Sequence, residues 1–124
     1  MIVLESGPSL IPNIVDILIR FRRWKFALSS DISKAFLQIA LHEKDKDVHR
    51  FFLDFNGKLR QMRFCRVTFG VKSSPFLLNA TIRHHLGKFG QSRVVEELLE
   101  NLYVDDWLSG ADSESEVNNM TVSV

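Results

Sequence analysis

Apolar residues recur at near-helical spacing in three stretches of the chain, and each stretch predicts a helix. The first helix follows Asn13, a residue type that caps helices well. Its apolar positions are Ile14, Val15, Ile17, Leu18 and Phe21. Another helix is predicted over residues 93–101, where apolar residues again recur at helical spacing. Residues 113–116 have the composition of a further helix start.

The last of the three apolar stretches lies between these two helices, after a loop over residues 68–74, and predicts a helix of its own. Ser73 or Ser74 is the expected cap, Pro75 suits the first turn, and Gly87 suits the end. The apolar stripe of this helix is predicted to consist of Phe76, Leu77, Ala80, Ile82 and Leu86.

Alternating apolar and small polar residues predict a strand over residues 26–32, followed by a turn or short helix over 33–39. Residues 42–49 are charged without apolar periodicity, which predicts a surface loop. Asn56-Gly57 suits the positive dihedral angles of a type I′ turn, so residues 50–64 are predicted to form a β-hairpin. The buried face of its second strand cannot be assigned from the pattern.

A second hairpin is predicted where two apolar runs, residues 102–104 and 107–108, flank Asp105-Asp106. The element order is then helix, strand, hairpin, helix, helix, hairpin. This order predicts an α+β fold, an antiparallel sheet with helices packed on one face.

Charge is segregated along the chain. Residues 1–93 contain all 16 Lys and Arg and 7 acidic residues, a net +9, whereas residues 94–124 contain 8 acidic residues and no Lys or Arg, a net −8. Basic surface attracts phosphate backbones and clustered carboxylates attract divalent cations, although two solvated faces would give the same pattern.

Composition excludes several classes of protein. The 124 residues suffice for one domain, and no apolar run approaches the length that spans a bilayer. No signal peptide is evident at the start of the sequence. The single cysteine, Cys65, forms no internal disulfide, and with His84 and His85 it lacks the spacing of a zinc site. We therefore expect an intracellular protein with no membrane association, not a secreted one.

Three aspartates are the candidate chemical groups. Asp105 and Asp106 lie at the predicted hairpin tip, and Asp31 ends the predicted strand. Each also has a simpler interpretation, a surface turn for the pair and a helix cap for Asp31. If the strands are neighbours, three carboxylates converge at one edge, and oxygen ligands of this kind suit Mg²⁺.

Three segments carry a family resemblance. Residues 30–39 read Ser-Asp-Ile-Ser-Lys-Ala-Phe-Leu-Gln-Ile, residues 69–76 read Phe-Gly-Val-Lys-Ser-Ser-Pro-Phe, and residues 103–106 read Tyr-Val-Asp-Asp. In order and approximate spacing they resemble the palm motifs of retroelement reverse transcriptases, and their wording is most similar to the Pao/BEL group of LTR retrotransposons. The resemblance covers roughly residues 5–115.

The resemblance implies roles for individual residues. Asp31 and Asp105 would be the main ligands of two Mg²⁺ ions, with Mn²⁺ as a possible substitute, assisted by the Ile32 carbonyl. Asp106 would be a further acidic group near the primer end. The residues expected at the incoming nucleotide are Ala35, Phe36, Phe69, Gly70 and Lys72.

Some of these assignments have alternatives. Phe36 stands where the family places an aromatic gate against a ribose 2′-hydroxyl, but a core phenylalanine is a rival interpretation. Retroviral members have Gln where this chain has Phe69, which leaves the contacts of that position open. Lys72 is equally consistent with an exposed loop lysine.

Nucleic-acid contacts are expected from Tyr103, Arg63 and Arg66. Other basic candidates for contact with the phosphate backbone are Arg20, Arg22, Arg23, Lys25 and Arg60. The implied partners are an RNA or DNA template with a primer, deoxynucleoside triphosphates and the remainder of a Pol polyprotein, in the cytoplasm or in virus-like particles.

By the same resemblance, residues 1–124 are a partial reverse transcriptase domain. It would contain the palm and a fingers/palm hairpin at residues 50–66, with incomplete fingers, no thumb and poor polymerisation by the isolated chain. Two other interpretations stay open, a non-catalytic retroelement-derived fragment with weak nucleic-acid binding and an unrelated α+β binding module.

Overall fold

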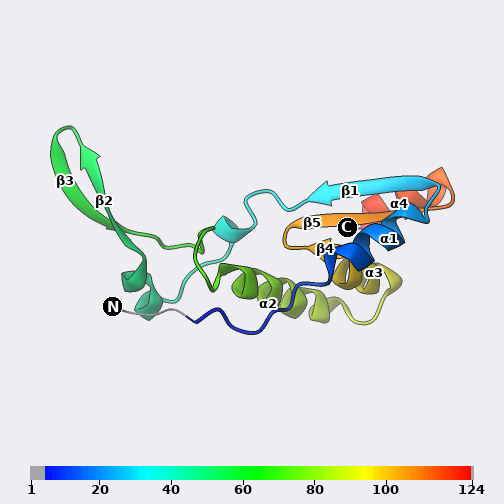
Figure 1. Ribbon diagram of the computed structural model, residues 1–124, viewed down its shortest axis with the longest axis horizontal. Coiled ribbons are helices and arrows are strands. Elements are labelled where there is room, and N and C mark those ends of the chain that lie inside the picture. Colours follow the sequence, from blue (N-terminus) through cyan, green and yellow to red (C-terminus); the bar gives the residue numbers. More distant parts are fainter. Residues whose placement is uncertain (1–4, 124) are drawn as a thin grey trace.

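An antiparallel sheet and a separate β-hairpin make up the strands of the molecule (Figure 1). The computed structural model describes residues 5–123. The sheet has the strand order β1-β5-β4, with β1 at Phe26–Asp31, β5 at Asp106–Ala111 and β4 at Leu102–Tyr103. The hairpin pairs β2, Arg50–Phe55, with β3, Lys58–Arg63. The predicted α+β class with an antiparallel sheet is confirmed.

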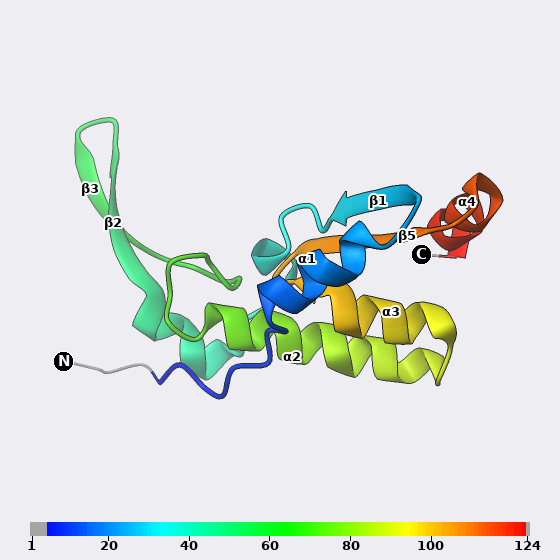
Figure 2. The ribbon, with the colours of Figure 1, turned by 45° about the vertical axis from the view of Figure 1, so that its right-hand side comes forward.

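Residues 5–123 contain four α-helices, α1 at Ile14–Arg22, α2 at Ser74–Leu86, α3 at Arg93–Asn101 and α4 at Glu114–Ser123. Short 3₁₀ turns occupy Phe36–Gln38, Glu43–His49 and Gly87–Phe89. Helices α1, α3 and α4 contact the sheet, and α2 lies below it with α3 in both views (Figures 1 and 2). Within residues 5–123, no helix combines the length and apolar character that crossing a membrane requires.

The two faces of the sheet differ in burial. On β5, Trp107, Ser109 and Ala111 point to one face and are all buried. Asp106 points to the other face, where it is exposed like its cross-strand partner Asp31. Helix α3 lies on the first face, because Ser109 Oγ donates a hydrogen bond to Glu97 Oε2 at 3.2 Å. The expected packing of helices on one face agrees with this pattern, and the aspartates lie on the open face.

Helix α1 begins where the sequence predicted. The side-chain oxygen of Asn13 accepts a hydrogen bond from the amide of Val15 at 2.9 Å, which satisfies one of the free donors of the first turn. Its apolar positions are buried only in part, because Val15 and Leu18 are 56% and 44% exposed, whereas Ile17 is fully buried. The helix therefore rests on the sheet along a narrower stripe than its composition indicates.

The cap position of α2 is Ser73, one of the two residues predicted, but its side chain does not make the expected contact. Ser73 holds the cap position without a side-chain cap hydrogen bond in the described chain, and Ser74 Oγ donates instead to the Thr68 carbonyl. The predicted stripe also missed the residues of this helix that are most buried, which include Leu78 and Asn79. The end of the helix at Gly87 is confirmed.

Residues 42–49 lie at the surface as predicted, but they are mostly a regular turn and not a loop. Glu43–His49 is a 3₁₀ turn, and His42 Nδ1 accepts from the Lys44 amide at 3.4 Å. Lys46 and Glu43 form an ion pair at 2.7 Å, and their three-residue separation suits a 3₁₀ turn, which brings such residues into line. The pattern of apolar residues carries no information about an element that is stabilised by such local polar contacts.

The hairpin turn at Asn56-Gly57 is confirmed. Asn56 and Gly57 have φ angles of 54° and 75°, as a type I′ turn requires. Every residue of β2 and β3 is exposed, including Phe52 at 68% and Leu59 at 71%. No buried face could be assigned from the sequence because, among the described residues, neither face of the hairpin is buried.

Candidate active site

Three residues form a row across the end of the sheet. Asp31 is the direct cross-strand partner of Asp106, which in turn pairs with Tyr103 on β4. Residues directly opposite in an antiparallel pair project from the same face, with Cβ atoms about 4.5–5.5 Å apart. The open face of the sheet therefore presents two carboxylates and a half-buried tyrosine side by side at one end.

The turn between β4 and β5 consists of Val104 and Asp105. The sequence placed both aspartates at the tip, but Asp106 already belongs to β5 and only Asp105 lies in the turn. Val104 has a φ of 58°, which is unfavourable for a β-branched residue. Such backbone strain persists only where the surroundings hold it, and it is concentrated at functional sites.

A backbone hydrogen bond ties the turn to the end of β1. The amide of Ile32 donates to the carbonyl oxygen of Asp105 at 2.9 Å. Asp31 and Asp105 are therefore brought together by the backbone, although 73 residues separate them in sequence. All three predicted carboxylates lie at this one end of the sheet.

The oxygen atoms of the three aspartates determine which metal ions this end of the sheet can bind. Within residues 5–123, no group of three or more His, Cys, Asp or Glu side chains is arranged to hold a metal ion by itself. Mg²⁺ does not need such a group, because it is usually bound by one or two carboxylates, with water and substrate phosphates supplying the other ligands. The carboxylates at the end of the sheet fit an ion that is held jointly with a nucleotide.

The segment after Asp31 is compact. Lys34 has a φ of 52°, and Gln38 Nε2 donates to the Ser33 carbonyl at 2.6 Å, which closes the segment on itself. Ala35 is only 4% exposed, and Phe36 is half-buried. Half burial leaves part of the Phe36 ring in the core and part accessible, so both interpretations of this residue retain support.

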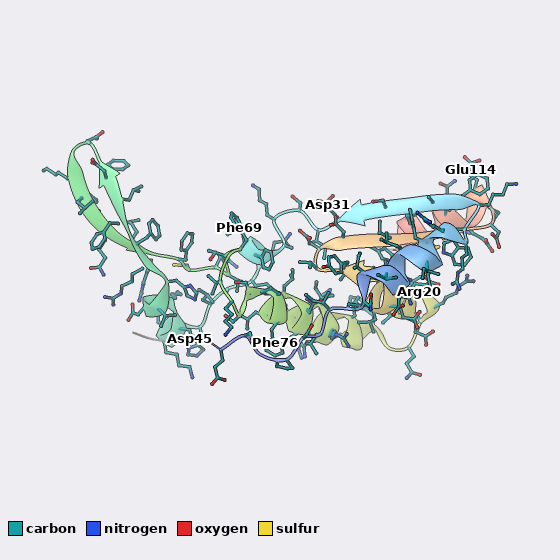
Figure 3. All side chains as sticks on the ribbon, in the orientation of Figure 1. Arg20, Asp31, Asp45, Phe69, Phe76 and Glu114 are labelled. Carbon is teal, nitrogen blue, oxygen red and sulfur yellow. The ribbon has the colours of Figure 1, made fainter. Side chains whose placement is uncertain are left out.

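Phe69 and Gly70 lie on an accessible loop. Phe69 is 77% exposed, Gly70 has a φ of 81°, and Lys72 is exposed. The loop is anchored by buried Val67, whose amide donates to the Ile39 carbonyl at 2.9 Å. Figure 3 shows Phe69 between the hairpin and Asp31. The ring of Phe69 is therefore accessible to solvent on the side of the loop that lies between the hairpin and Asp31.

Arg63, one of the predicted nucleic-acid contacts, is engaged within the protein. Its Nη2 lies 2.5 Å from Glu43 Oε1, and its Nη1 lies 2.8 Å from Asp47 Oδ1. Hydrogen bonds from Lys46 and then Arg63 lower the pKa of Glu43, and those from Arg50 and then Arg63 lower the pKa of Asp47. Hydrogen bonds to Asp47 and Glu43 raise the pKa of Arg63. These contacts fix the base of the hairpin against the 3₁₀ turn.

The other basic candidates differ in their surroundings. Arg66 is exposed, and its contact with the Gln38 carbonyl is long, at 3.5 Å. Arg23 lies over the ring of Trp24, at 4.4 Å from its centroid. Arg20 donates from Nε to Asn101 Oδ1 at 2.9 Å and from Nη2 to the Glu100 carbonyl at 2.7 Å. Arg20 therefore serves the packing of α1 on α3 and is not placed as a free phosphate ligand.

Sequence reasoning missed a polar cluster on the face of the sheet that α3 covers. Buried Asn101 immediately precedes β4, and its Nδ2 donates to Glu97 Oε2 at 2.9 Å. Buried Ser109 on β5 donates to the same oxygen. The only sequence signal was the position of Asn101 at the junction of a predicted helix with the predicted hairpin.

The comparisons with known proteins address the chain as a whole. Residues 5–124 match the family model described as reverse transcriptase (RNA-dependent DNA polymerase), and this match covers nearly the full sequence. None of the curated proteins compared with the chain matches it. The family match extends over the sheet, the open face with its aspartates and the hairpin alike, and the chain therefore belongs to the reverse transcriptase family.

Proposed function

We propose that this chain supplies the catalytic palm of an RNA-directed DNA polymerase, which adds deoxynucleotides to a primer with two divalent metal ions. The observation that carries the proposal is the pairing of Asp31 with Asp106, together with the hydrogen bond from Ile32 to the Asp105 carbonyl. Membership in the reverse transcriptase family supports the same reaction.

Each acidic residue has a proposed part. Asp31, Asp105 and the Ile32 carbonyl would hold the ions, and Asp106 would lie near the primer end. Bound Mg²⁺ or Mn²⁺ would favour the ionised primer 3′-hydroxyl and neutralise charge on the triphosphate. The chain's own contribution is positioning, because the strand pairing holds the carboxylates at one end of the sheet before substrate arrives.

The residues around the aspartates would bind the substrates. Exposed Phe69 with Gly70 would border the nucleotide and template, Lys72 would contact phosphate, and the accessible part of Phe36 would lie against the sugar. Ala35, being buried, would support Phe36 from behind. Tyr103, in the same row as the aspartates, and exposed Arg66 would contact nucleic acid.

We also propose a lineage and a context from the wording of the three motifs. The chain would derive from a Pao/BEL-like LTR retrotransposon, act as part of a Pol polyprotein, and work in the cytoplasm or in virus-like particles. Extending the reading frame in both directions tests this proposal. Fingers and thumb sequences flanking the palm would support it, and unrelated flanking domains would contradict it.

Metal binding tests the proposed chemistry directly. Mn²⁺ is titrated into the protein in the presence of a primer–template and the complementary nucleotide. Electron paramagnetic resonance measures how much of the Mn²⁺ is bound. Asp31→Asn and Asp105→Asn are expected to weaken Mn²⁺ binding by at least about tenfold, the lower end of what loss of even an outer-sphere partner costs. Asp112→Asn, which removes an exposed carboxylate just beyond the far end of β5, is the matched control and should bind as the unaltered chain does.

Two outcomes separate the alternatives. Equal Mn²⁺ binding by the unaltered chain and Asp31→Asn would refute a metal site at the end of the sheet. Site-dependent Mn²⁺ binding without addition of even one nucleotide, at high protein concentration in a primer-extension assay, would instead identify a non-catalytic fragment. Weak but Asp31-dependent addition is the expected result.

A further inference from the structure

We propose that Glu97 is a positioning residue that holds β5 on α3 close to the point where α3 passes into β4, and so sets the place of Asp105 and Asp106 relative to Asp31. That Glu97 matters for catalysis rests on the proposed function. The structural content of the inference, that one carboxylate oxygen fixes the hairpin on α3, can be tested independently of catalysis.

The contacts of one oxygen atom carry the proposal. Glu97 Oε2 accepts a hydrogen bond from Asn101 Nδ2 at 2.9 Å and another from Ser109 Oγ at 3.2 Å. Asn101 is the last residue before β4, whereas Ser109 lies on β5, three residues beyond Asp106. Because Asn101 is also the last residue of α3, the first bond lies within the helix and holds the Glu97 carboxylate in place, and the second bond ties β5 to α3.

The donors have little access to water. Asn101 is 4% exposed and Ser109 is 1% exposed. A buried donor that loses its acceptor is left unsatisfied at the full cost of its desolvation. Removing the Glu97 carboxylate would therefore leave two buried donors without an acceptor. Hydrogen bonds to a carboxylate are also stronger than those between neutral groups.

Helix α1 completes the arrangement from the other side. Arg20 donates to Asn101 Oδ1 at 2.9 Å, so both ends of the Asn101 amide are bonded, one to α1 and one to α3. This fixes the amide in one orientation and joins α1 to the end of α3 from which β4 starts. The strained φ of 58° at Val104 in the turn needs such support on either side, because an unsupported turn would relax.

The consequence appears at the opposite end of the hairpin. The Ile32 amide reaches the Asp105 carbonyl only while the turn keeps its position relative to β1. Loss of the Glu97 contacts should loosen the hairpin on α3, weaken this hydrogen bond, and separate Asp31 from Asp105. The Ile32 amide is therefore a local reporter of the state of the site.

Hydrogen exchange of the Ile32 amide, followed by NMR, tests the inference. Glu97→Ala is expected to speed this exchange at least about tenfold, as the loss of one hydrogen bond to a charged group would. Glu97→Gln should restore protection, because the amide oxygen of Gln can still accept from both Asn101 and Ser109. Glu96→Ala removes an exposed carboxylate from the same helix and should leave the exchange unchanged.

General destabilisation is separated by a second control. Val95→Ala creates a cavity under the same helix without touching the Glu97 contacts, and its unfolding in urea can be matched to that of Glu97→Ala. Faster exchange at Ile32 in Glu97→Ala than in Val95→Ala supports a positioning role. Equal exchange in the two variants, or failure of Glu97→Gln to restore protection, overturns it.

Metal affinity links the result to the active site. If the proposed function holds, Glu97→Ala should weaken Mn²⁺ binding and Glu97→Gln should recover it. If the unaltered chain binds no Mn²⁺, the polymerase proposal fails while the exchange measurement still decides the role of Glu97. The two failures are therefore distinguishable.

Discussion

Asp31 and Asp106 are direct partners across the antiparallel pair of β1 and β5. Both are exposed, and they project from the face of the sheet that the helices leave open. Like charges placed directly opposite each other are destabilising, yet this pair stands at the one end of the sheet where the acidic turn residue also lies. Three carboxylates at one end of a sheet repel one another and lower the stability of the fold. A bound cation would neutralise this repulsion, which gives the arrangement a physical reason.

The first prediction follows from this repulsion. Asp106→Asn should stabilise the fold by about 0.2–1 kcal/mol in the absence of divalent ions, because it removes a like charge opposite Asp31. Urea unfolding at low ionic strength measures the effect, and added salt should reduce it through screening. Asp112→Asn serves as the control and should change little. A loss of stability in Asp106→Asn would show that repulsion does not dominate at this pair.

A second prediction concerns Gly110 on β5. A Cβ atom at this position would overlap the Phe26 carbonyl and the side chain of Trp24, which lies against the sheet. Gly110→Ala should destabilise the protein by about 1–3 kcal/mol, the usual cost of forcing extra volume into a packed site. The free energy of unfolding in urea measures this.

The matched control for Gly110 is the glycine at the end of α2. Gly87 has a helical φ of −58°, and an added Cβ meets no atom within 4 Å. Gly87→Ala should therefore stabilise the chain by about 0.4–1 kcal/mol by restricting the unfolded state. Similar effects of the two substitutions would contradict the close approach at Gly110.

Local chemistry explains which parts of the fold were predictable. Asn13 caps a helix and Asn56-Gly57 makes a turn through contacts within a few residues, so the sequence alone located α1 and the β2–β3 hairpin. The 3₁₀ turn at Glu43–His49 escaped prediction, because its ion pairs leave no apolar period.

Long-range contacts explain what the sequence did not reveal about the site. The aspartates could be identified as candidates from their motifs, but the register that sets Asp31 opposite Asp106 depends on strands that are far apart in the chain. The hydrogen bond from Arg20 to Asn101 joins residues 81 positions apart, and neither residue type signals such a contact. The sequence therefore identified the acidic groups of the site but not the residues that support them.

A third prediction tests the turn of the exposed hairpin. Gly57 has a φ of 75°, and a Cβ there would meet nothing within 4 Å, so only backbone conformation opposes a side chain. Gly57→Ala should weaken the hairpin by about 1–2 kcal/mol, the cost of a left-handed conformation for an L-residue. Cross-strand NMR contacts between Phe51 and Met62, which pair in the hairpin, report its population.

The control for the turn is Lys58→Ala, which changes the next residue without a demand on φ. It should leave the contacts between Phe51 and Met62 in place. Unchanged contacts in Gly57→Ala as well would mean that the hairpin is held by its base and not by its turn.

The last prediction concerns the ion pairs at that base. Arg63 bonds to Glu43 and Asp47, and the pKa of each carboxyl lies below its ordinary value. A carboxylate with a lowered folded-state pKa stabilises the native contacts above its ordinary pKa and loses this contribution as the pH falls through the folded-state value. Ordinary values are about 4.3 for Glu and 3.9 for Asp, so attachment of the hairpin should be constant near neutral pH and weaken below about pH 4. Arg63 stays protonated throughout this range and adds no pH dependence of its own.

The amide of Phe64 provides the readout, because it donates to the His49 carbonyl at 3.1 Å where the hairpin meets the 3₁₀ turn. Its NMR chemical shift should move between pH 5 and pH 2 (a range of about three units around the ordinary carboxyl values) and should respond to added salt, since the paired side chains are exposed to screening. Arg63→Gln removes the shared partner of both carboxylates and should move the transition toward higher pH. A Phe64 resonance that titrates identically in Arg63→Gln would show that Arg63 does not fasten the hairpin, and would leave its guanidinium available for the nucleic-acid contact that the sequence predicted.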